Sequence, residues 1–555
     1  MGRKFTLTAL VAALSAAGIS LAFGHSAEVH ERMMVRNLAP PRLSDSMRPV
    51  VARDVAPNAG IFEYGTGPIG YGLPLVAVGP DSAPYNVAML DSGGHFLSRT
   101  RMATWGVWDS VSDVADSANQ PMFETHNIAS SPVSDKVCIT WVRTDTSPMP
   151  GYYRLSGDGG ANWDSVKQLD WPAAYGGDTA ASFHLSSFYP FYDEKDKLHV
   201  LAAVHPIVNG TGYIMPAGIW HWCPDYNPNW HLLRRAGCAP EHLGAPIGYN
   251  ALYACRPSGC YADQGWLFAV WEEFDSSNVD PQTNLLRAGI RICFFDSGGA
   301  YGSTLITSPG PYSCRFPGVC GFDESLLVTY EIDQCAGFGV VGQGPCTANP
   351  IAAQHLSIYT GAGRLDTIGG TTYDLQACGP ARTTVHGDSW YGIHATWMYS
   401  RDTTGAFPDL NARYNFYDYF GFWNWIDPDF MQSGVNIFDR SAGFGCLDVE
   451  PSTGIAVVSA CTPPPLPQVA VEEGRKPQAP SRKPGPTIVR GILNLQPAIY
   501  NLQSEIVLLD VGGRKVLTLK PGANDVSTLS PGVYFVRSTI DTRQASSTAK
   551  VFITK

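Results

Sequence analysis

The side chains with the clearest chemical potential in this sequence are two carboxylates that directly follow short apolar runs. Glu272 comes straight after Trp271, and Glu331 comes straight after Tyr330. Two carboxylates near one axis could bind a cation or divide the acid and base roles of a reaction. We take Glu272 and Glu331 as candidates on that ground but assign no catalytic residue, because charges at strand ends more often simply meet water.

Eight more charged or polar side chains follow apolar runs in a similar way and are candidates for binding a ligand. They are Arg143, Asp145, His205, Glu273, Asp275, Asp333, Arg401 and Asp402. Solvation is again the alternative explanation for each of them. His386 and His394 flank Trp390, but no third ligand is in view, so neither a metal site nor a cofactor is predicted.

The elements that must position these side chains are apolar runs that recur along the chain. The runs centre on Ala77, Trp141, Ala202, Trp271, Tyr330, Trp397 and Val458, at intervals of 64, 61, 69, 59, 67 and 61 residues. No stretch shows sustained helical periodicity, and the 57 glycines and 42 prolines favour turns. An all-β repeat of about 60 residues is typical of β-propeller blades, although longer than the common families. We predict six blades, with both chain ends completing the sixth, or alternatively seven if the run at Ala77 begins its own.

A strand, a tight turn and a second strand are predicted between Tyr152 and Lys167. The Asp158 carboxylate can accept hydrogen bonds from the backbone that follows it, and the adjacent glycines supply positive φ angles. The turn residues Ser156, Asp158, Gly160 and Trp163 resemble the Asp box of sialidase-type β-propellers. The same Asp-to-aromatic spacing recurs at Asp91 with Phe96, Asp225 with Trp230, Asp296 with Tyr301, and Asp418 with Trp423. We predict structural roles for these turns and place them on the face opposite the ligand candidates.

Thirteen cysteines in a chain predicted to be exported suggest disulfides. Two loops share a pattern, Cys255 to Cys260 and Cys314 to Cys320, and each is short enough to close as a hairpin disulfide. Cys335 with Cys346 and Cys446 with Cys461 are further predicted pairs, although connectivity does not follow from sequence. Zinc is the alternative for the first two loops, but histidine and a second cysteine pair are missing nearby.

The chain ends differ from its centre. Residues 1–24 have the charge and apolar run of a secretory signal peptide, for which a membrane anchor is the alternative, and residues 25–60 look irregular. The propeller is predicted over residues 61–462. Residues 463–487 are rich in proline with arginine and lysine, which predicts a stiff, solvated linker. Residues 488–555 alternate as short strands and predict a small Ig-like β-sandwich.

This tail resembles the type A C-terminal sorting domain of the type IX secretion system. The matching strings are Leu509 to Val516, Asn524 to Val526, Leu529 to Phe535, and the strand that begins at Lys550. The resemblance implies export by an outer-membrane machine, and so a secreted or surface location in a Gram-negative-type bacterium. An accessory Ig-like module without a sorting role is the alternative.

Function is less determined than fold. The net charge of −11 argues against nucleic acid and anionic membranes as partners. The main prediction is a propeller that binds a glycan or protein without catalysis. The alternative is a sialidase-type glycoside hydrolase, as the Asp-box resemblance implies. That family's N-terminal Arg-Ile-Pro string is absent, and the nearest string, Arg315 to Pro317, lies in the fourth blade. A peptidase or other hydrolase is less favoured, because neither Gly-x-Ser-x-Gly nor His-Glu-x-x-His occurs.

Overall fold

The structure of the chain is a computed structural model. It describes residues 75–461 with gaps at 81–84, 91–95, 101–109, 114–124, 145, 173–178, 209–210, 263–264, 323, 360, 362, 378, 389–391, 419–420, 439–440 and 451–454. It also describes residues 487–554 with gaps at 491, 496–504, 511–513, 521, 531 and 540–547. The chain divides into two compact units, Met1–Pro463 and Pro464–Lys555.

The first unit is a β-propeller with five blades, each an antiparallel meander of four strands in chain order. The first blade is β5 (Asn127–Ser130), β6 (Val137–Val142), β7 (Gly151–Ser156) and β8 (Lys167–Leu169), and the second is β10 (Tyr189–Tyr192), β11 (Leu198–Val208), β13 (Ala217–Trp222) and β14 (Trp230–Ala236). The third is β15 (Ala254–Ala262), β16 (Trp266–Val279), β17 (Leu286–Asp296) and β18 (Gly299–Leu305). The fourth is β19 (Ser313–Phe322), β20 (Ser325–Asp333), β21 (Asn349–Ser357) and β22 (Gly363–Thr371), and the fifth is β23 (Val385–Asp388), β24 (Gly392–Tyr399), β25 (Asn411–Tyr417) and β26 (Val435–Asn436).

Short elements decorate this frame. The C-terminal half of β11 also pairs with β9 (Thr179–Phe183) and β12 (Thr211–Gly212). Three 3-10 helices occur in the described residues, η3 (Pro240–His242), η5 (Gly339–Val341) and η6 (Phe430–Gln432). No helix within these residues is long and apolar enough to cross a membrane.

The predictions of six blades and of seven are wrong, because the structure shows five. The remaining strands form two separate sheets, β1 (Leu75–Val78) to β4 (Ser110–Asp113) through β2 (Tyr85–Leu90) and β3 (Phe96–Thr100), and the hairpin of β27 (Gly443–Glu450) and β28 (Ile455–Cys461). Each strand pairs with its chain neighbour, which needs only a short loop to close, rather than with a strand from the other end of the chain.

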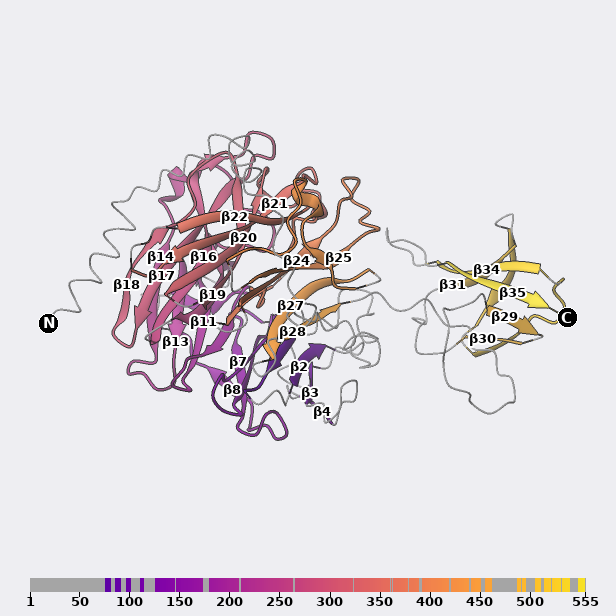
Figure 1. Cartoon of the computed structure of the whole chain (residues 1–555), viewed down its shortest axis with the longest axis horizontal. Helices are drawn as coiled ribbons and strands as arrows, with labels where there is room; N and C mark the ends of the chain where they lie inside the picture. The colour runs from indigo at the N-terminus through magenta and orange to yellow at the C-terminus, as the bar shows by residue number, and fades with distance from the viewer. Residues whose placement is uncertain are drawn as a thin grey trace. The chain divides into compact units, whose positions relative to one another are not determined.

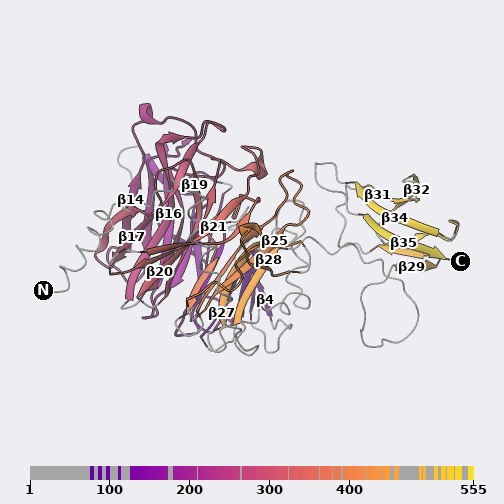
Figure 2. The same cartoon turned by 45° about the horizontal axis from the view of Figure 1, so that its top comes forward.

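The two end sheets nevertheless meet and complete the circle of sheets. Strand β1 contacts both β5 and β27, and the orange strands β27 and β28 lie beside the indigo strands in Figures 1 and 2. One apolar cluster spans this junction and includes Ala77, Trp141, Tyr414, Leu447 and Val457. The junction is therefore held by packing between segments more than 350 residues apart.

The turn predicted at Tyr152 to Lys167 is present between β7 and β8. Asp158 accepts a hydrogen bond from the Asn162 backbone N–H at 2.8 Å, and Ser156 accepts one from the Gly160 N–H at 2.7 Å. Trp163 packs against the junction cluster. Asp225, Asp296 and Asp418 also lie between or at the ends of third and fourth strands, and Tyr301 donates to Asp296 at 2.6 Å. Asp91 lies outside the described residues.

The predicted disulfides are absent from the described residues, in which Cys255, Cys260, Cys314, Cys320, Cys335, Cys346 and Cys446 are all free thiols. The first two pairs lie along single strands, β15 and β19, rather than across hairpins. An extended strand rises about 3.3 Å per residue, which separates these Cα atoms beyond the roughly 7 Å that a disulfide tolerates. Cys446 is paired in the sheet with Ser459, whereas Cys461 is opposite Gly443.

The second unit contains two sheets. The larger has the strand order β29 (Thr487–Arg490), β35 (Thr548–Thr554), β34 (Gly532–Thr539), β31 (Glu505–Leu509) and β32 (Lys515–Leu519), and the smaller pairs β30 (Ile492–Leu495) with β33 (Gly522–Asp525). Strands β29 and β35 are parallel, and the other pairs are antiparallel. The proline-rich linker lies outside the described residues, and the Ig-like sandwich stays a prediction.

Candidate functional site in the central channel

A cavity of about 680 Å³ lies in the channel at the centre of the propeller, where the first strands of the sheets end. Residues near the ends of β1, β5, β10, β15, β19 and β27, together with β23, line it. We call the side on which first strands end the lower face and the opposite side the upper face. The cavity therefore belongs to the lower face, whereas the sequence placed the ligand candidates on the other one.

Two glycines allow neighbouring first strands to approach closely beside this cavity. A Cβ atom at Gly321 would lie 2.5 Å from the carbonyl oxygen of Tyr261 on β15. A Cβ atom at Gly387 on β23 would lie 2.5 Å from the carbonyl oxygen of Gly321 on β19. Contacts that short involve backbone atoms, so any larger residue would push the strands apart and reshape the cavity wall.

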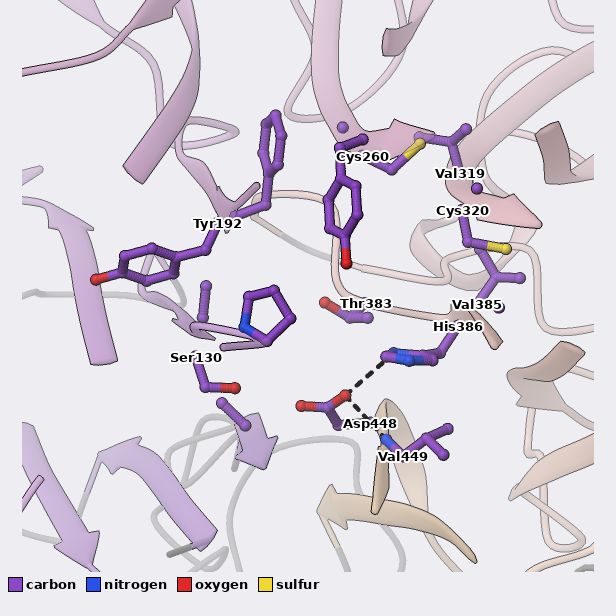
Figure 3. A pocket seen from close by; sticks show the side chains of 18 of the residues that line it. Ser130, Tyr192, Cys260, Val319, Cys320, Thr383, Val385, His386, Asp448 and Val449 are labelled. Carbon is purple, nitrogen blue, oxygen red and sulfur yellow. Dashed lines mark hydrogen bonds and ion pairs between the residues drawn. The ribbon is translucent and has the colours of Figure 1, made fainter. Parts of the chain in front are cut away.

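The polar groups of the cavity come from strands at both ends of the chain, as Figure 3 shows. The Asp448 Oδ1 atom lies 3.1 Å from the His386 Nδ1 atom, and Asp448 Oδ2 accepts a hydrogen bond of 2.7 Å from the Val78 backbone N–H. The Tyr189 hydroxyl lies 3.5 Å from the Thr383 hydroxyl. Burial raises the pKa of Tyr189 to about 12, so this phenol stays neutral and can donate.

The upper end of the channel is filled by hydrogen-bonded side chains. Asn127, at the start of β5, donates to the Phe188 carbonyl oxygen at 3.0 Å and to the Ala381 carbonyl oxygen at 2.9 Å. The bond to Phe188 joins β5 to the neighbouring second blade, and the bond to Ala381 joins β5 to the segment that precedes β23 of the fifth blade. Asn127 therefore links three blades at the upper end of the channel.

Glu272 is part of this filled end and is completely buried. Arg315 Nε and Arg256 Nη1 lie 2.7 and 3.1 Å from Glu272 Oε2, and the Phe316 backbone N–H donates to Oε1 at 2.9 Å. Burial alone would raise the pKa of Glu272, but the two arginines and the Phe316 N–H outweigh it and lower the pKa. The carboxylate is thus ionised, enclosed and fully engaged, which suits a structural role better than an acid or a ligand-binding role.

Bulges in two first strands bring these partners to Glu272. The pairing of β15 with β16 shifts register between Cys255 and Ser258, and the pairing of β19 with β20 shifts between Arg315 and Gly318. Arg256 and Phe316 adopt positive φ values of 50° and 54° at these bulges. A positive φ is unfavourable for a non-glycine residue. At these two bulges it brings the Arg256 side chain and the Phe316 N–H to the buried Glu272 carboxylate, and these contacts offset the cost.

Glu331 has a different environment, among other acids. Asn349 donates to Glu331 Oε1 at 2.8 Å, whereas Glu331 Oε2 is buried without a hydrogen-bond partner in the described residues. Burial, and then the charges of Asp333 and Asp374, raise the pKa of Glu331 well above its ordinary value. Burial likewise raises the pKa of Asp333 to about 8 and that of Asp374 to about 6. Glu331 borders a void of only about 30 Å³, too small for a sugar.

The other predicted candidates do not form one site with these residues. His205 is buried beside His184, with a ring-centroid distance of 5.9 Å, and burial lowers its pKa. Arg143 is half-buried just after β6, and Asp145 lies outside the described residues. Arg401 pairs with Asp429 at 3.1 Å on the surface.

Three further candidates have local roles. Asp402 accepts backbone hydrogen bonds from Thr404, Ala406 and Phe407, as a turn residue does. Glu273 and Asp275 line a second, smaller pocket on the upper face. Groups of three or more His, Cys, Asp or Glu placed to hold a metal ion do not occur among the described residues.

The cavity residues were mostly missed from the sequence. Tyr189, Thr383 and Asp448 lie in or next to first strands, whereas most of the apolar runs that reveal the repeat are second strands. From the sequence, His386 stands out only as one of the two histidines that flank Trp390. The regular spacing of the apolar runs could have located them. In a propeller, the strand about ten residues before each second strand lines the channel.

No protein-family model matches the chain, and no curated protein sequence matches it. Among solved structures it is similar to the NanB sialidase from Streptococcus pneumoniae, at 9% identity over 71% of this chain and 81% of that one, with a TM-score of 0.36. It is also similar to an α-L-arabinanase from Penicillium chrysogenum complexed with arabinobiose (10% identity, 68% and 98% covered, TM-score 0.35) and to the SapL1 lectin in complex with α-methyl fucoside (11%, 66% and 97%, 0.33). The propeller assignment rests on the sheet topology of this chain rather than on these scores.

We expect Glu272→Gln to destabilise the propeller strongly, because it leaves Arg256 and Arg315 buried without their counter-charge. Removing one partner of a buried ion pair costs about 3–5 kcal/mol. The measurement is urea denaturation followed by tryptophan fluorescence. Glu241→Gln, a matched change at an exposed residue, should stay within about 0.5 kcal/mol of wild type. Equal midpoints for the two variants would refute a structural role for Glu272.

The acid group around Asp333 predicts a pH dependence with a definite sign. From pH 4 to about 8 the unfolded chain ionises Asp333 while the folded chain keeps it protonated. Unfolding then releases a proton, so this residue's contribution to stability is full below pH 4 and is lost as the pH rises. Asp333→Asn keeps an acceptor for the Cys335 N–H. Its free energy of unfolding, measured by urea titration, should therefore rise relative to that of wild type between pH 5 and 8.

The control for that measurement is Asp402→Asn. Hydrogen bonds from the Thr404 side chain and from nearby backbone N–H groups lower the pKa of Asp402 to about 2. The difference in free energy of unfolding between this variant and wild type should stay constant between pH 5 and 8. If the profiles of Asp333→Asn and wild type run parallel, Asp333 is not held neutral in the folded protein.

Proposed function

We propose that this protein binds a neutral glycan in its central cavity and does not change it chemically. The observation that carries the proposal is the cavity of about 680 Å³ on the lower face. Pockets for small molecules are usually about 300–1,000 Å³ and combine an apolar lining with a few polar groups. This cavity has both, and a hollow of this volume suits an inserted sugar better than the flat surface of a protein partner.

The polar groups suit the hydroxyls of a sugar, which donate and accept hydrogen bonds in turn. Asp448 offers carboxylate oxygens as acceptors, with 16% of its side chain exposed. Thr383 and Tyr189 offer hydroxyls, and Tyr192 and Phe191 add aromatic carbon against which a sugar ring can pack. Hydrogen bonds to a charged acceptor are roughly twice as strong as neutral ones, so Asp448 is the expected anchor.

The charge of the lining favours a neutral ligand over an anionic one. Glu194, Glu324 and Asp448 line the cavity, and none of the described lining residues is lysine or arginine. A sialic acid would bring its carboxylate toward three like charges and meet no cation other than a protonated His386. Arg256 and Arg315 are enclosed around Glu272, away from any incoming substrate. These features support binding over the sialidase-type alternative that the Asp-box resemblance implies.

We further propose that residues 488–555 direct export, so that the propeller is secreted or displayed on the cell surface through the outer-membrane machinery. The support is the resemblance of the tail to type IX sorting domains, together with its separation as a compact unit, Pro464–Lys555. Asp510 and Arg514, which belong to the matching strings, are joined by a hydrogen bond of 2.9 Å from Arg514 Nε to Asp510 Oδ2. The attachment or removal of the tail is a property of that machinery.

The glycan proposal is tested with residues 25–555 on an array of neutral and sialylated glycans, followed by calorimetry on the best ligand. We expect neutral glycans to bind and to be recovered intact by chromatography. Asp448→Asn should raise the dissociation constant at least about tenfold, the loss expected for one charged hydrogen bond. Glu241→Gln, on the exposed η3, should leave it unchanged. Release of a cleaved product, or binding confined to sialosides, would overturn the proposal.

The export proposal predicts that deletion of residues 488–555 leaves the protein in the periplasm. The measurement is fractionation of cells that express the native secretion machinery, with surface protease shaving as the readout. Asp448→Asn in the full chain is the matched control, because it changes the cavity and leaves the tail intact. Surface display of the truncated chain would show that residues 488–555 are not the export signal.

A further inference from the structure

A second pocket, of about 250 Å³, lies on the upper face beside the third blade. Three arginines from two blades line it, Arg234 on β14 and Arg287 and Arg291 on β17. The far wall is the segment from Ser308 to Tyr312, where Asn278 donates to the Gly310 carbonyl oxygen at 3.0 Å. This pocket is separate from the central cavity and opens on the opposite face.

Glu273 fixes two of the arginines in place. Its Oε1 and Oε2 atoms accept hydrogen bonds of 2.8 and 3.2 Å from Arg234, and Arg291 Nε lies 3.0 Å from Oε2. The Trp271 indole N–H also donates to Oε2, at 3.1 Å. The carboxylate is therefore saturated, and it acts as a support that orients the two guanidinium groups rather than as a free acceptor.

The guanidinium groups keep donors that no protein acceptor uses. Arg287 pairs with Asp280 through Nη2 at 3.2 Å, but its Nε is buried without a hydrogen-bond partner, and only 8% of the side chain is exposed. Arg291 Nε is also buried without a hydrogen bond of good geometry among the described residues, although it lies 3.0 Å from Glu273 Oε2. A buried donor without an acceptor costs about 1–3 kcal/mol, which a bound anion would recover.

The charges of the pocket are close to balanced, so donors rather than net charge define its ligand. Three guanidinium groups face two lining carboxylates, Glu273 and Asp275, and Asp280 pairs with Arg287 from outside the lining. Asp275 accepts two hydrogen bonds from Ser277, at 2.9 and 2.7 Å, which reduces its repulsion of an anion. The three arginines come from two strands, β14 and β17, and together carry more N–H groups than the roughly four lone-pair sites of a carboxylate can accept.

We propose that this pocket binds a tetrahedral oxyanion, sulfate or phosphate, between Arg234, Arg287 and Arg291. The oxygen atoms of such an ion can meet donors from three guanidinium groups on two strands, and arginine is the side chain that holds such groups best. The oxyanion is either a free ion or an ester on a sugar, and the ester presents three terminal oxygens where the free ion presents four. This site does not depend on the glycan proposal, because it uses other residues on the other face.

The test is calorimetry on residues 25–555 with inorganic sulfate, inorganic phosphate and N-acetylglucosamine 6-sulfate, each against sodium chloride at equal ionic strength. We expect saturable binding of at least one of the three oxyanions. Binding of the free ions assigns the pocket to inorganic anions, and binding of the sugar ester alone assigns it to sulfated glycans. Absence of saturable binding by all three overturns the proposal.

Variants locate the binding. Arg287→Gln should weaken it at least about tenfold, as loss of a charged hydrogen bond does, and Asp275→Asn should tighten it by removing a like charge. Arg234→Gln, at a side chain that is 36% exposed, provides a second test should Arg287→Gln fail to fold. Asp448→Asn should bind the oxyanion as wild type does, and unchanged binding in both arginine variants overturns the assignment.

Discussion

The pairing of Glu272 with Arg256 and Arg315 is the constraint on which the centre of this molecule depends. Three charges are withdrawn from water there, and each side chain is almost wholly buried. Such a group is stable only while all of its members are present, because a single uncompensated charge costs several kcal/mol. It ties the first strands of two blades together at the upper end of the channel. The open volume is left at the lower end, where small residues such as Gly321 and Gly387 line the wall.

Much of the fold could be predicted because the sequence repeats at the level of one strand per blade. The buried aromatics Trp141, Trp271, Tyr330 and Trp397 all lie on second strands, which explains a period of about 60 residues. The blade count could not be predicted in the same way. It depends on which strands pair at the two chain ends, and edge pairing is set by tertiary packing rather than by any local pattern.

Less of the candidate site could be predicted, for two physical reasons. Charges at strand ends are visible in sequence, but Glu272 and Glu331 differ from exposed acids only through partners on other blades, such as Arg315 and Asn349. The cavity residues Thr383 and Asp448 are far apart in sequence and are brought together by packing of the segment around β23 against β27. The pattern shared by Cys255 to Cys260 and Cys314 to Cys320 is a true repeat, but it does not indicate disulfides. It marks bulged first strands that deliver an arginine to a buried acid, with no disulfide.

The junction between β1 and β27 constrains how the protein folds as it emerges during synthesis or export. The Val78 N–H and the Asp448 carboxylate that accepts its hydrogen bond are 370 residues apart. A chain that emerges from a ribosome or a pore with its N-terminus first cannot make this contact until nearly the whole propeller is out, and contacts of such separation form slowly. Unpaired sheet edges persist during that interval and invite aggregation. Because Asp448 also lines the cavity, the wall of that cavity is completed only when the last sheet edge of the nascent chain is covered.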